Sequence, residues 1–198
     1  MGGMGLGPPA SFAGGWTLMM AAMMLPSALP LLYRFGQEME SRRHWPLAAG
    51  VLAGTYLAVW LGFGLALYVI YTALGMPWPN QPIVGAAAIG LAAIYGLTPL
   101  KRAAQARCRE LCSLHQPLPF NVWRAGAVAG FRYGLSCLGC NAFLMAAMLA
   151  VGMTNLAWAV LVSVFAVLYR LVPRRSGLRF EVLVSLTLGV AAAVNVVG

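Results

Sequence analysis

Residues 47–74 read LAAGVLAGTYLAVWLGFGLALYVIYTAL, without a single charged side chain. A membrane-spanning helix needs about 20 consecutive apolar residues, so this stretch is long enough to cross a bilayer with some tilt. The whole chain has the same character, with 61% hydrophobic and 9% charged residues, whereas soluble domains carry roughly a quarter charged residues. The sequence therefore predicts an all-α membrane protein, organised as a single integral membrane domain over residues 1–198.

Five further apolar segments predict a six-helix transmembrane bundle. The predicted spans cover residues 13–33, 47–74, 83–100, 133–152, 154–172 and 180–197. All thirteen Lys and Arg lie in alternate connections, namely 34–46, the Cys-containing loop 101–132, and the connection from Arg170 to Arg179. Because basic connections stay in the cytoplasm, both termini are expected outside.

The formal net charge of +9 is part of this topology signal. In a soluble protein such a charge would favour nucleic acid, but here it indicates the cytoplasmic side and a surface for anionic lipid heads. We predict the lipid bilayer, and no nucleic acid, as a partner. Aromatic residues are expected to anchor the spans at the two membrane boundaries. They are Trp16, Trp78 and Trp158 outside, and Tyr33, Trp45, Trp123, Tyr133 and Tyr169 inside.

Carboxylates and imidazoles are missing from the interior of the predicted spans. The four acidic residues and both histidines lie in or beside the cytoplasmic connections. Proton-coupled transporters, b-type haem proteins and membrane metalloproteases need such groups within the bundle, so these classes are disfavoured. We predict no catalytic and no organic cofactor-binding residues.

Four cysteines form two helically spaced pairs. Cys108 and Cys112 are four residues apart in a segment that Thr98 is predicted to cap, with Pro99 as its first helical residue, so both thiols share one face. His115 extends that face. Cys137 and Cys140 lie where the fourth span leaves the cytoplasm, so both pairs are expected on the same side of the membrane.

A glycine stripe precedes the second pair, at Gly126, Gly130 and Gly134. Glycine at every fourth position lets another helix backbone approach closely. The stripe is therefore expected to hold the thiols of the second pair against a neighbouring helix.

The cysteines admit several interpretations. They could simply pack as small apolar side chains, whereas a disulfide is disfavoured by the reducing cytoplasm. Four thiolates would suit Zn(II), and two or three would suit Cu(I). We favour a soft metal ion, with Cu(I) preferred and Zn(II) as the alternative, and expect sulfur ligands within about 4 Å of one another if they share one metal.

The methionine content is also unusual, with eleven methionines in the chain. Four crowd the first span before Pro26, which is expected to kink or break the helix, and two lie on the Cys137 face of the fourth span. These weaker candidate ligands are Met19, Met20, Met23, Met24, Met145 and Met148. Thioethers suit Cu(I), which makes a relay for a soft ion conceivable, although methionine is also an adaptable core filler.

Several blocks resemble a bacterial family of predicted metal-binding integral membrane proteins, whose members are of unknown function or are linked to copper. The blocks are WTLMMAAMMLPSALP, YGLTPLKRAAQARCRELC, FRYGLSCLGCNAFLM and VGMTNLAW, spread over residues 13–172. The resemblance implies a helix bundle in the bacterial cytoplasmic (inner) membrane and a bound metal. It departs at Asn141, where family members often carry a further cysteine, and at Tyr169-Arg170, where they tend to have an acid-base pair.

Three functions follow as hypotheses. The leading one is binding of a soft metal, with Cys108, Cys112, Cys137 and Cys140 as ligands, for delivery, export or insertion into a partner. That partner would be a metallochaperone or a metalloenzyme being assembled. The alternatives are a scaffold or assembly subunit without metal, and a thiol-disulfide oxidoreductase, although enzymes of that kind normally work on the outer face.

Overall fold

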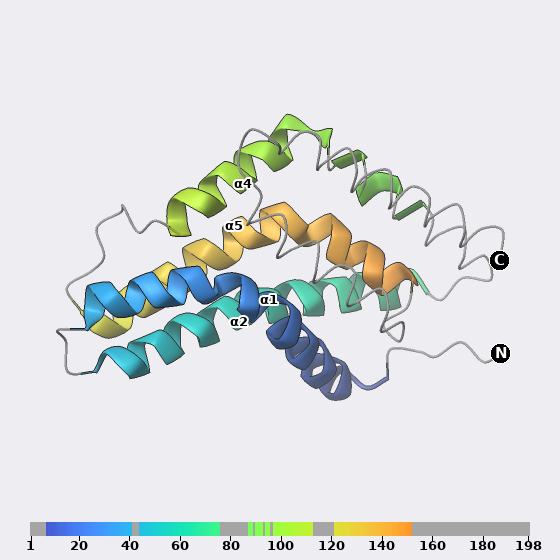
Figure 1. Cartoon of the computed structure of the whole chain (residues 1–198). Coiled ribbons are helices and arrows are strands. Elements are labelled where there is room, and N and C mark those ends of the chain that lie inside the picture. Colours follow the sequence, from blue (N-terminus) through green and yellow to red (C-terminus); the bar gives the residue numbers. More distant parts are fainter. Residues whose placement is uncertain are drawn as a thin grey trace. The chain divides into compact units, whose positions relative to one another are not determined.

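The computed structural model describes residues 7–40, 44–75, 87–112 except 89, 93 and 96, and 121–151. These residues form helices and contain no strand, as the sequence predicts. The helices are α1 (Pro9–Met39), α2 (Trp45–Ala73), α4 (Pro99–Cys112) and α5 (Val122–Val151), shown in Figure 1. The described residues between positions 87 and 97 are helical as well.

The helix bounds extend the predicted spans. α1 contains the span predicted at 13–33, and α2 matches the one at 47–74 to within two residues. α5 begins at Val122, well before the span predicted to start at residue 133, so the expected loop 101–132 is helical at both ends. Within the described residues, α1 and α2 are the helices long and apolar enough to cross a membrane. The spans predicted at 154–172 and 180–197 lie outside the described residues.

The chain groups into two compact units. One combines Leu6–Ile70 with Ala103–Cys140 and holds α1, α2 and most of α4 and α5. The other includes Tyr71–Arg102 and the chain from Asn141 onward. Within the second unit, the rings of Tyr95 and Phe143 stack with their centroids 4.4 Å apart.

α1 and α2 pack as an antiparallel hairpin. The Trp16 indole donates its Nε1 hydrogen to the Trp60 carbonyl at 2.9 Å and lies directly on Gly64. At the other end of the hairpin, a β-carbon on Gly36 would lie 3.3 Å from the Trp45 ring. Trp16 is fully buried in this contact. The expectation that it anchors the chain at the lipid boundary is therefore wrong.

The glycine stripe brings α5 into backbone contact with α2, as predicted. β-Carbons added at Gly126 and Gly130 would collide with α2, and one added at Gly134 would lie 3.0 Å from it. The opposing groups are, in the same order, the Ala48 carbonyl, the Leu52 carbonyl and the Val59 side chain. Since both series of residue numbers rise together, α2 and α5 run parallel.

α1 bends in its middle, where it changes direction in Figure 1. Pro26 and Pro30 lie inside this helix, and proline can donate no hydrogen to the carbonyl four residues earlier. The helix nevertheless continues to Met39. Pro26 therefore kinks the helix and does not break it.

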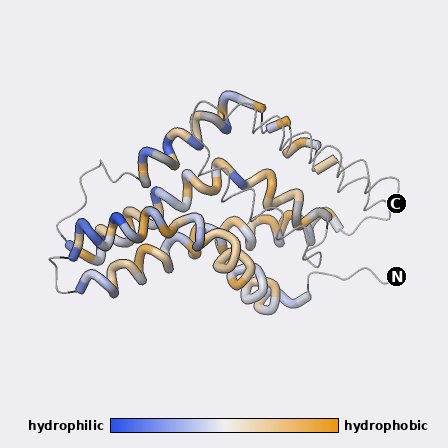
Figure 2. Tube along the Cα trace, viewed as in Figure 1, coloured by the Kyte–Doolittle hydropathy of each residue, from blue (hydrophilic) through white to orange (hydrophobic). Residues whose placement is uncertain are grey.

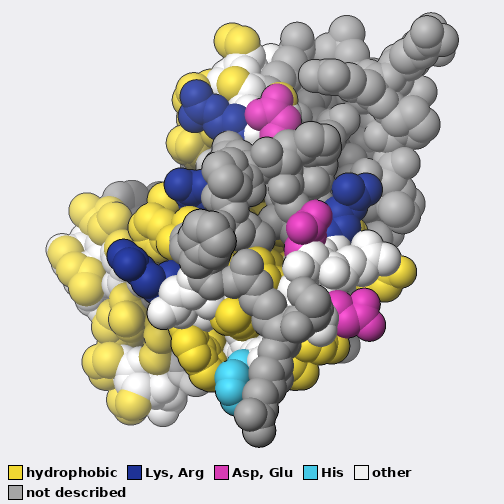
Figure 3. All heavy atoms as spheres, turned by 90° about the vertical axis from the view of Figure 1, so that its left-hand side faces the viewer, with side chains coloured by type: hydrophobic (Ala, Val, Ile, Leu, Met, Phe, Trp, Pro, Cys, Tyr) yellow, Lys and Arg dark blue, Asp and Glu magenta, His cyan; other side chains and the backbone are white. Residues whose placement is uncertain are grey.

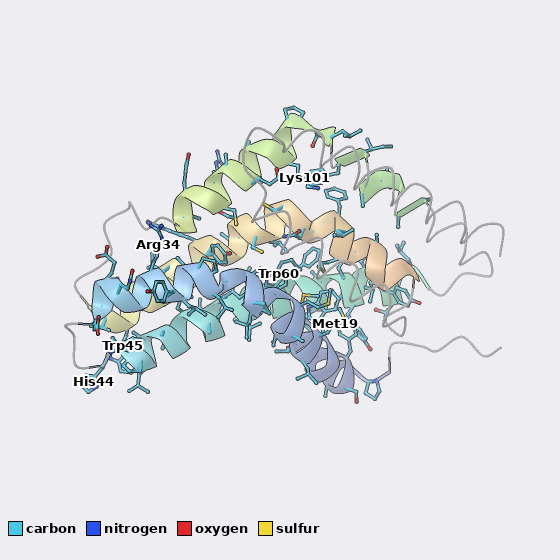
Figure 4. All side chains as sticks on the ribbon, viewed as in Figure 1. Met19, Arg34, His44, Trp45, Trp60 and Lys101 are labelled. Carbon is cyan, nitrogen blue, oxygen red and sulfur yellow. The ribbon has the colours of Figure 1, made fainter. Side chains whose placement is uncertain are left out.

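Hydrophilic residues gather on particular helices. Figure 2 shows them along α4 and toward the C-terminal end of α1, while most of α2 is apolar. The face turned to the viewer in Figure 3 carries arginine or lysine, acidic and histidine side chains among apolar ones. Arg34, His44 and Trp45 lie at the end of the hairpin where α1 ends and α2 begins, and Met19 lies in the other half of α1 (Figure 4).

Candidate metal site

Cys137 lies in the core where α1, α2 and α5 meet. Its side chain is fully buried, and so is Tyr56 on α2. The Tyr56 hydroxyl oxygen lies 3.3 Å from the Cys137 Sγ, with either atom able to be the donor. The glycine stripe accounts for this contact, because the backbones of α5 and α2 approach closely at Gly126 and Gly130, on the turns before Cys137. The expectation that the stripe holds the second cysteine pair against a neighbouring helix is thus confirmed for Cys137.

The bend of α1 lies beside the contact between Tyr56 and Cys137. Tyr56 also donates its hydroxyl hydrogen toward the Met24 carbonyl, at the long distance of 3.5 Å. Ser27 donates to that same carbonyl at 2.6 Å, and the Ser27 carbonyl accepts from the Tyr133 hydroxyl at 2.9 Å. Side chains from α2 and α5 therefore bind backbone oxygens on both sides of Pro26, at the level of Cys137.

Cys108 faces into its unit from α4. It is buried, together with Gln105 three residues earlier. One turn before Cys108, Ala104 touches α5, since a β-carbon on Gly139 would lie 3.4 Å from the Ala104 β-carbon. Cys140, the neighbour of Gly139, is half-buried. The first and second cysteine pairs thus belong to helices that contact each other beside Cys140.

The described cysteines do not form part of a group of three or more such metal ligands. Cys108, Cys137 and Cys140 form no disulfide within the described part of the chain. Among those residues, no three His, Cys, Asp or Glu side chains are grouped so that they could hold a metal ion. Cys112 is the last residue of α4, but its side chain lies outside the described ones, as does His115. The four-cysteine ligand set therefore stays a prediction.

The methionines of α1 face the core. Met20 and Met24 are fully buried, Met23 is nearly so, and Met19 is half-buried. Met145 on α5 is also fully buried, whereas the side chain of Met148 lies outside the described ones. Since the Tyr56 hydroxyl lies near both the Met24 carbonyl and the Cys137 sulfur, this part of α1 lies at the depth of the thiol.

Three aromatic residues of this core were not anticipated by sequence reasoning, and one of them, Tyr56, contacts a candidate ligand. Tyr133 was expected to be a boundary anchor, but it is fully buried and binds the Ser27 carbonyl, so that expectation is wrong. Tyr56 could have been singled out from the sequence, because a hydroxyl in the middle of an apolar span needs a hydrogen-bond partner. Trp60, one turn along α2, has a buried Nε1 hydrogen for which no acceptor occurs among the described residues.

One of the two predicted departures from the family pattern lies within the described residues. Asn141 follows Cys140 on α5 and is half-buried, so an amide stands where the resemblance predicts a thiol. Tyr169 and Arg170 lie outside the described residues.

In its described residues the protein is all-helical, with apolar helices and sulfur-bearing side chains in the core. Residues 13–194 match the family model PpoB2, which is described as a copper chaperone. The chain belongs to this family. Comparisons with curated proteins and with solved structures gave no match.

Proposed function

We propose that this protein is a copper chaperone of the bacterial inner membrane that binds Cu(I) through its cysteines and passes it to a metalloenzyme under assembly. The observation that carries the proposal is the family membership over residues 13–194, together with the full burial of Cys137, Met20 and Met24. Cysteine and methionine are both ligands of Cu(I), whereas magnesium and calcium require oxygen ligands.

Cys108, Cys112, Cys137 and Cys140 are the proposed ligands, with His115 as a weaker candidate. Two or three of these thiolates are enough for Cu(I), so the site does not need all four at once. The contact between α4 and α5 at Ala104 and Gly139 supports an approach of the two pairs. The methionines would be transient ligands between this site and the outer face, because Met20, Met23 and Met24 lie along one bent helix that touches Cys137 through Tyr56.

We further propose six spans, both termini outside and a single membrane domain. α1 and α2 expose large apolar side chains, for example Leu18 at 74% and Val69 at 61%, which a soluble surface seldom does in such numbers. The antiparallel pairing of α1 with α2 and the parallel pairing of α2 with α5 suit the first, second and fourth spans of that topology. Copper would then be collected from a cytoplasmic metallochaperone.

The test is Cu(I) binding by the purified full-length protein in detergent, measured under reducing conditions by competition with a chromogenic Cu(I) chelator. The double substitution Cys137→Ser and Cys140→Ser should lower the affinity by more than the 10- to 100-fold that loss of an outer partner typically costs. Ser136→Ala, on the same turn of α5, is the matched control and should leave the affinity unchanged.

A second set of variants addresses the methionines. Replacing Met19, Met20, Met23 and Met24 with leucine keeps apolar side chains of similar volume, so the fold should persist. Cu(I) affinity at the cysteines should also persist, while copper delivery across the membrane should slow. Delivery is measured as activation of a copper-dependent enzyme on the outer side of living cells.

Three outcomes would overturn the proposal. Stoichiometric zinc with no response to Cu(I) would point to a zinc site and make the methionines filler. Absence of any bound metal would favour a scaffold or assembly subunit. Oxidation and reduction of the Cys137–Cys140 pair by a quinone, with no metal bound, would favour a thiol-disulfide oxidoreductase.

A further inference from the structure

The Tyr56 hydroxyl stands between a proposed ligand and the bend of α1. Its oxygen lies 3.3 Å from the Cys137 Sγ and 3.5 Å from the Met24 carbonyl oxygen. Tyr56 and Cys137 are both fully buried, so water does not compete for these contacts from the surface. A hydroxyl carries one hydrogen, which it can place well in only one bond at a time.

Metal binding at Cys137 changes which hydrogen bond the Tyr56 hydroxyl can make in this contact. A neutral thiol can donate its S–H to the Tyr56 oxygen, which leaves the Tyr56 hydrogen for the Met24 carbonyl. A thiolate has no hydrogen and accepts only, so in this contact Tyr56 is then the donor to sulfur. Hydrogen bonds to an ionised partner are about twice as strong as neutral ones, and a buried thiolate without a donor would be costly.

We propose that Tyr56 is the positioning residue of Cys137, and that it turns its hydroxyl hydrogen from Met24 to the sulfur when Cu(I) binds. This inference rests on the proposed function, in which Cys137 is a copper ligand. Cu(I) displaces the thiol proton, which leaves to the buffer, and no electron is transferred. Tyr56 then acts on copper as the outer partners of metal ligands generally do, by orienting the ligand and stabilising its charged form.

The experiment compares Tyr56→Phe with Tyr133→Phe in the full chain. The two tyrosines are both fully buried, and their rings lie 5.5 Å apart. Each substitution removes one hydroxyl from the same core, but the Tyr133 hydroxyl binds the Ser27 carbonyl. Tyr56→Phe should weaken Cu(I) binding roughly 10- to 100-fold, whereas Tyr133→Phe should leave the Cu(I) affinity unchanged.

Infrared spectroscopy supplies a second measurement, whose result would not change if Tyr56 had only a structural role. The S–H stretching band of Cys137 is the band that Cys137→Ser removes from the metal-free protein. If this S–H donates to Tyr56, the band should lie at lower frequency in the natural protein than in Tyr56→Phe, and Tyr133→Phe should not shift it. Cu(I) should abolish the band.

The possible outcomes separate this inference from the proposed function. If Cys137→Ser binds Cu(I) as tightly as the natural protein, Cys137 is no ligand and the proposed site fails. If Cys137→Ser loses copper while Tyr56→Phe and Tyr133→Phe behave alike, only the role of Tyr56 is overturned. If Tyr56→Phe does not fold, the infrared spectrum of the natural protein alone tests the proposal. An S–H band of Cys137 at the frequency of a thiol without a hydrogen bond would overturn it.

Discussion

At the scale of single residues, glycines, which have no side chain, position the site as much as residues that carry one. Gly126 and Gly130 face carbonyl oxygens of α2 at distances that leave no room for a β-carbon. The fully buried Tyr133 and Cys137 follow on the same helix. The close approach of α5 to α2 is therefore what brings the Cys137 sulfur within reach of Tyr56.

Gly130→Ala tests this dependence. The added methyl would meet the Leu52 carbonyl, which is backbone and cannot rotate away, so the helices must separate. Overpacking of this kind costs roughly 1–3 kcal/mol of stability. Thermal unfolding in detergent measures the loss, and Cu(I) affinity should fall with it because the contact of Cys137 with Tyr56 loosens.

Gly62→Ala is the matched control. Gly62 is also a helical glycine, but a β-carbon there would meet nothing within 4 Å. Alanine at that position should be neutral or stabilise α2 by roughly 0.5–1 kcal/mol, because it lowers the entropy lost on folding. Equal destabilisation by both substitutions would contradict the close-packing argument.

At the scale of helices, the two that carry the cysteines begin at side-chain caps. The Lys101 amide donates to the Thr98 hydroxyl at 3.4 Å, which confirms the predicted start of α4 at Pro99. α5 begins in the same way, because the Trp123 and Arg124 amides donate to the Asn121 Oδ1 at 3.0 and 3.4 Å. The Asn121 cap places the first turn of α5 before the predicted span.

Asn121→Ala should destabilise the protein by about 1 kcal/mol, since it leaves helix-terminal amides without their acceptor. The measurement is the unfolding temperature in detergent. Asn121→Asp retains an acceptor oxygen and adds a negative charge at the positive end of the helix, so it should restore the stability. An alanine variant as stable as the natural protein would show that water replaces the cap at no cost.

At the scale of the whole molecule, the charge pattern predicts how the chain crosses the membrane. Reporter fusions after residues 40, 115 and 175 should give cytoplasmic signals, and fusions after residues 78 and 198 should give outward ones. The physical reason is that segments rich in Lys and Arg are retained on the cytoplasmic side. An outward signal at residue 115 would contradict the topology and remove the reason to expect reduced cysteines.

Features with a short-range cause could be predicted from the sequence alone. The apolar run 47–74 produces α2, Thr98 with Pro99 starts α4, and the four-residue glycine period produces a close helix contact, because each depends on residues within a few turns of one another. The soft-metal prediction agrees with the copper-chaperone family to which the chain belongs. Residue type and spacing carry that chemical signal without any knowledge of the fold.

The tertiary structure alone decided which residues meet. Trp16 and Tyr133 have the composition of membrane-boundary anchors, yet both are core residues, because α1, α2 and α5 close over them. The sequence places Tyr56 and Cys137 81 positions apart and contains no local signal for their contact. Helix packing is set by the fit of whole faces against each other, so the partner of a buried hydroxyl emerges only when the helices are assembled.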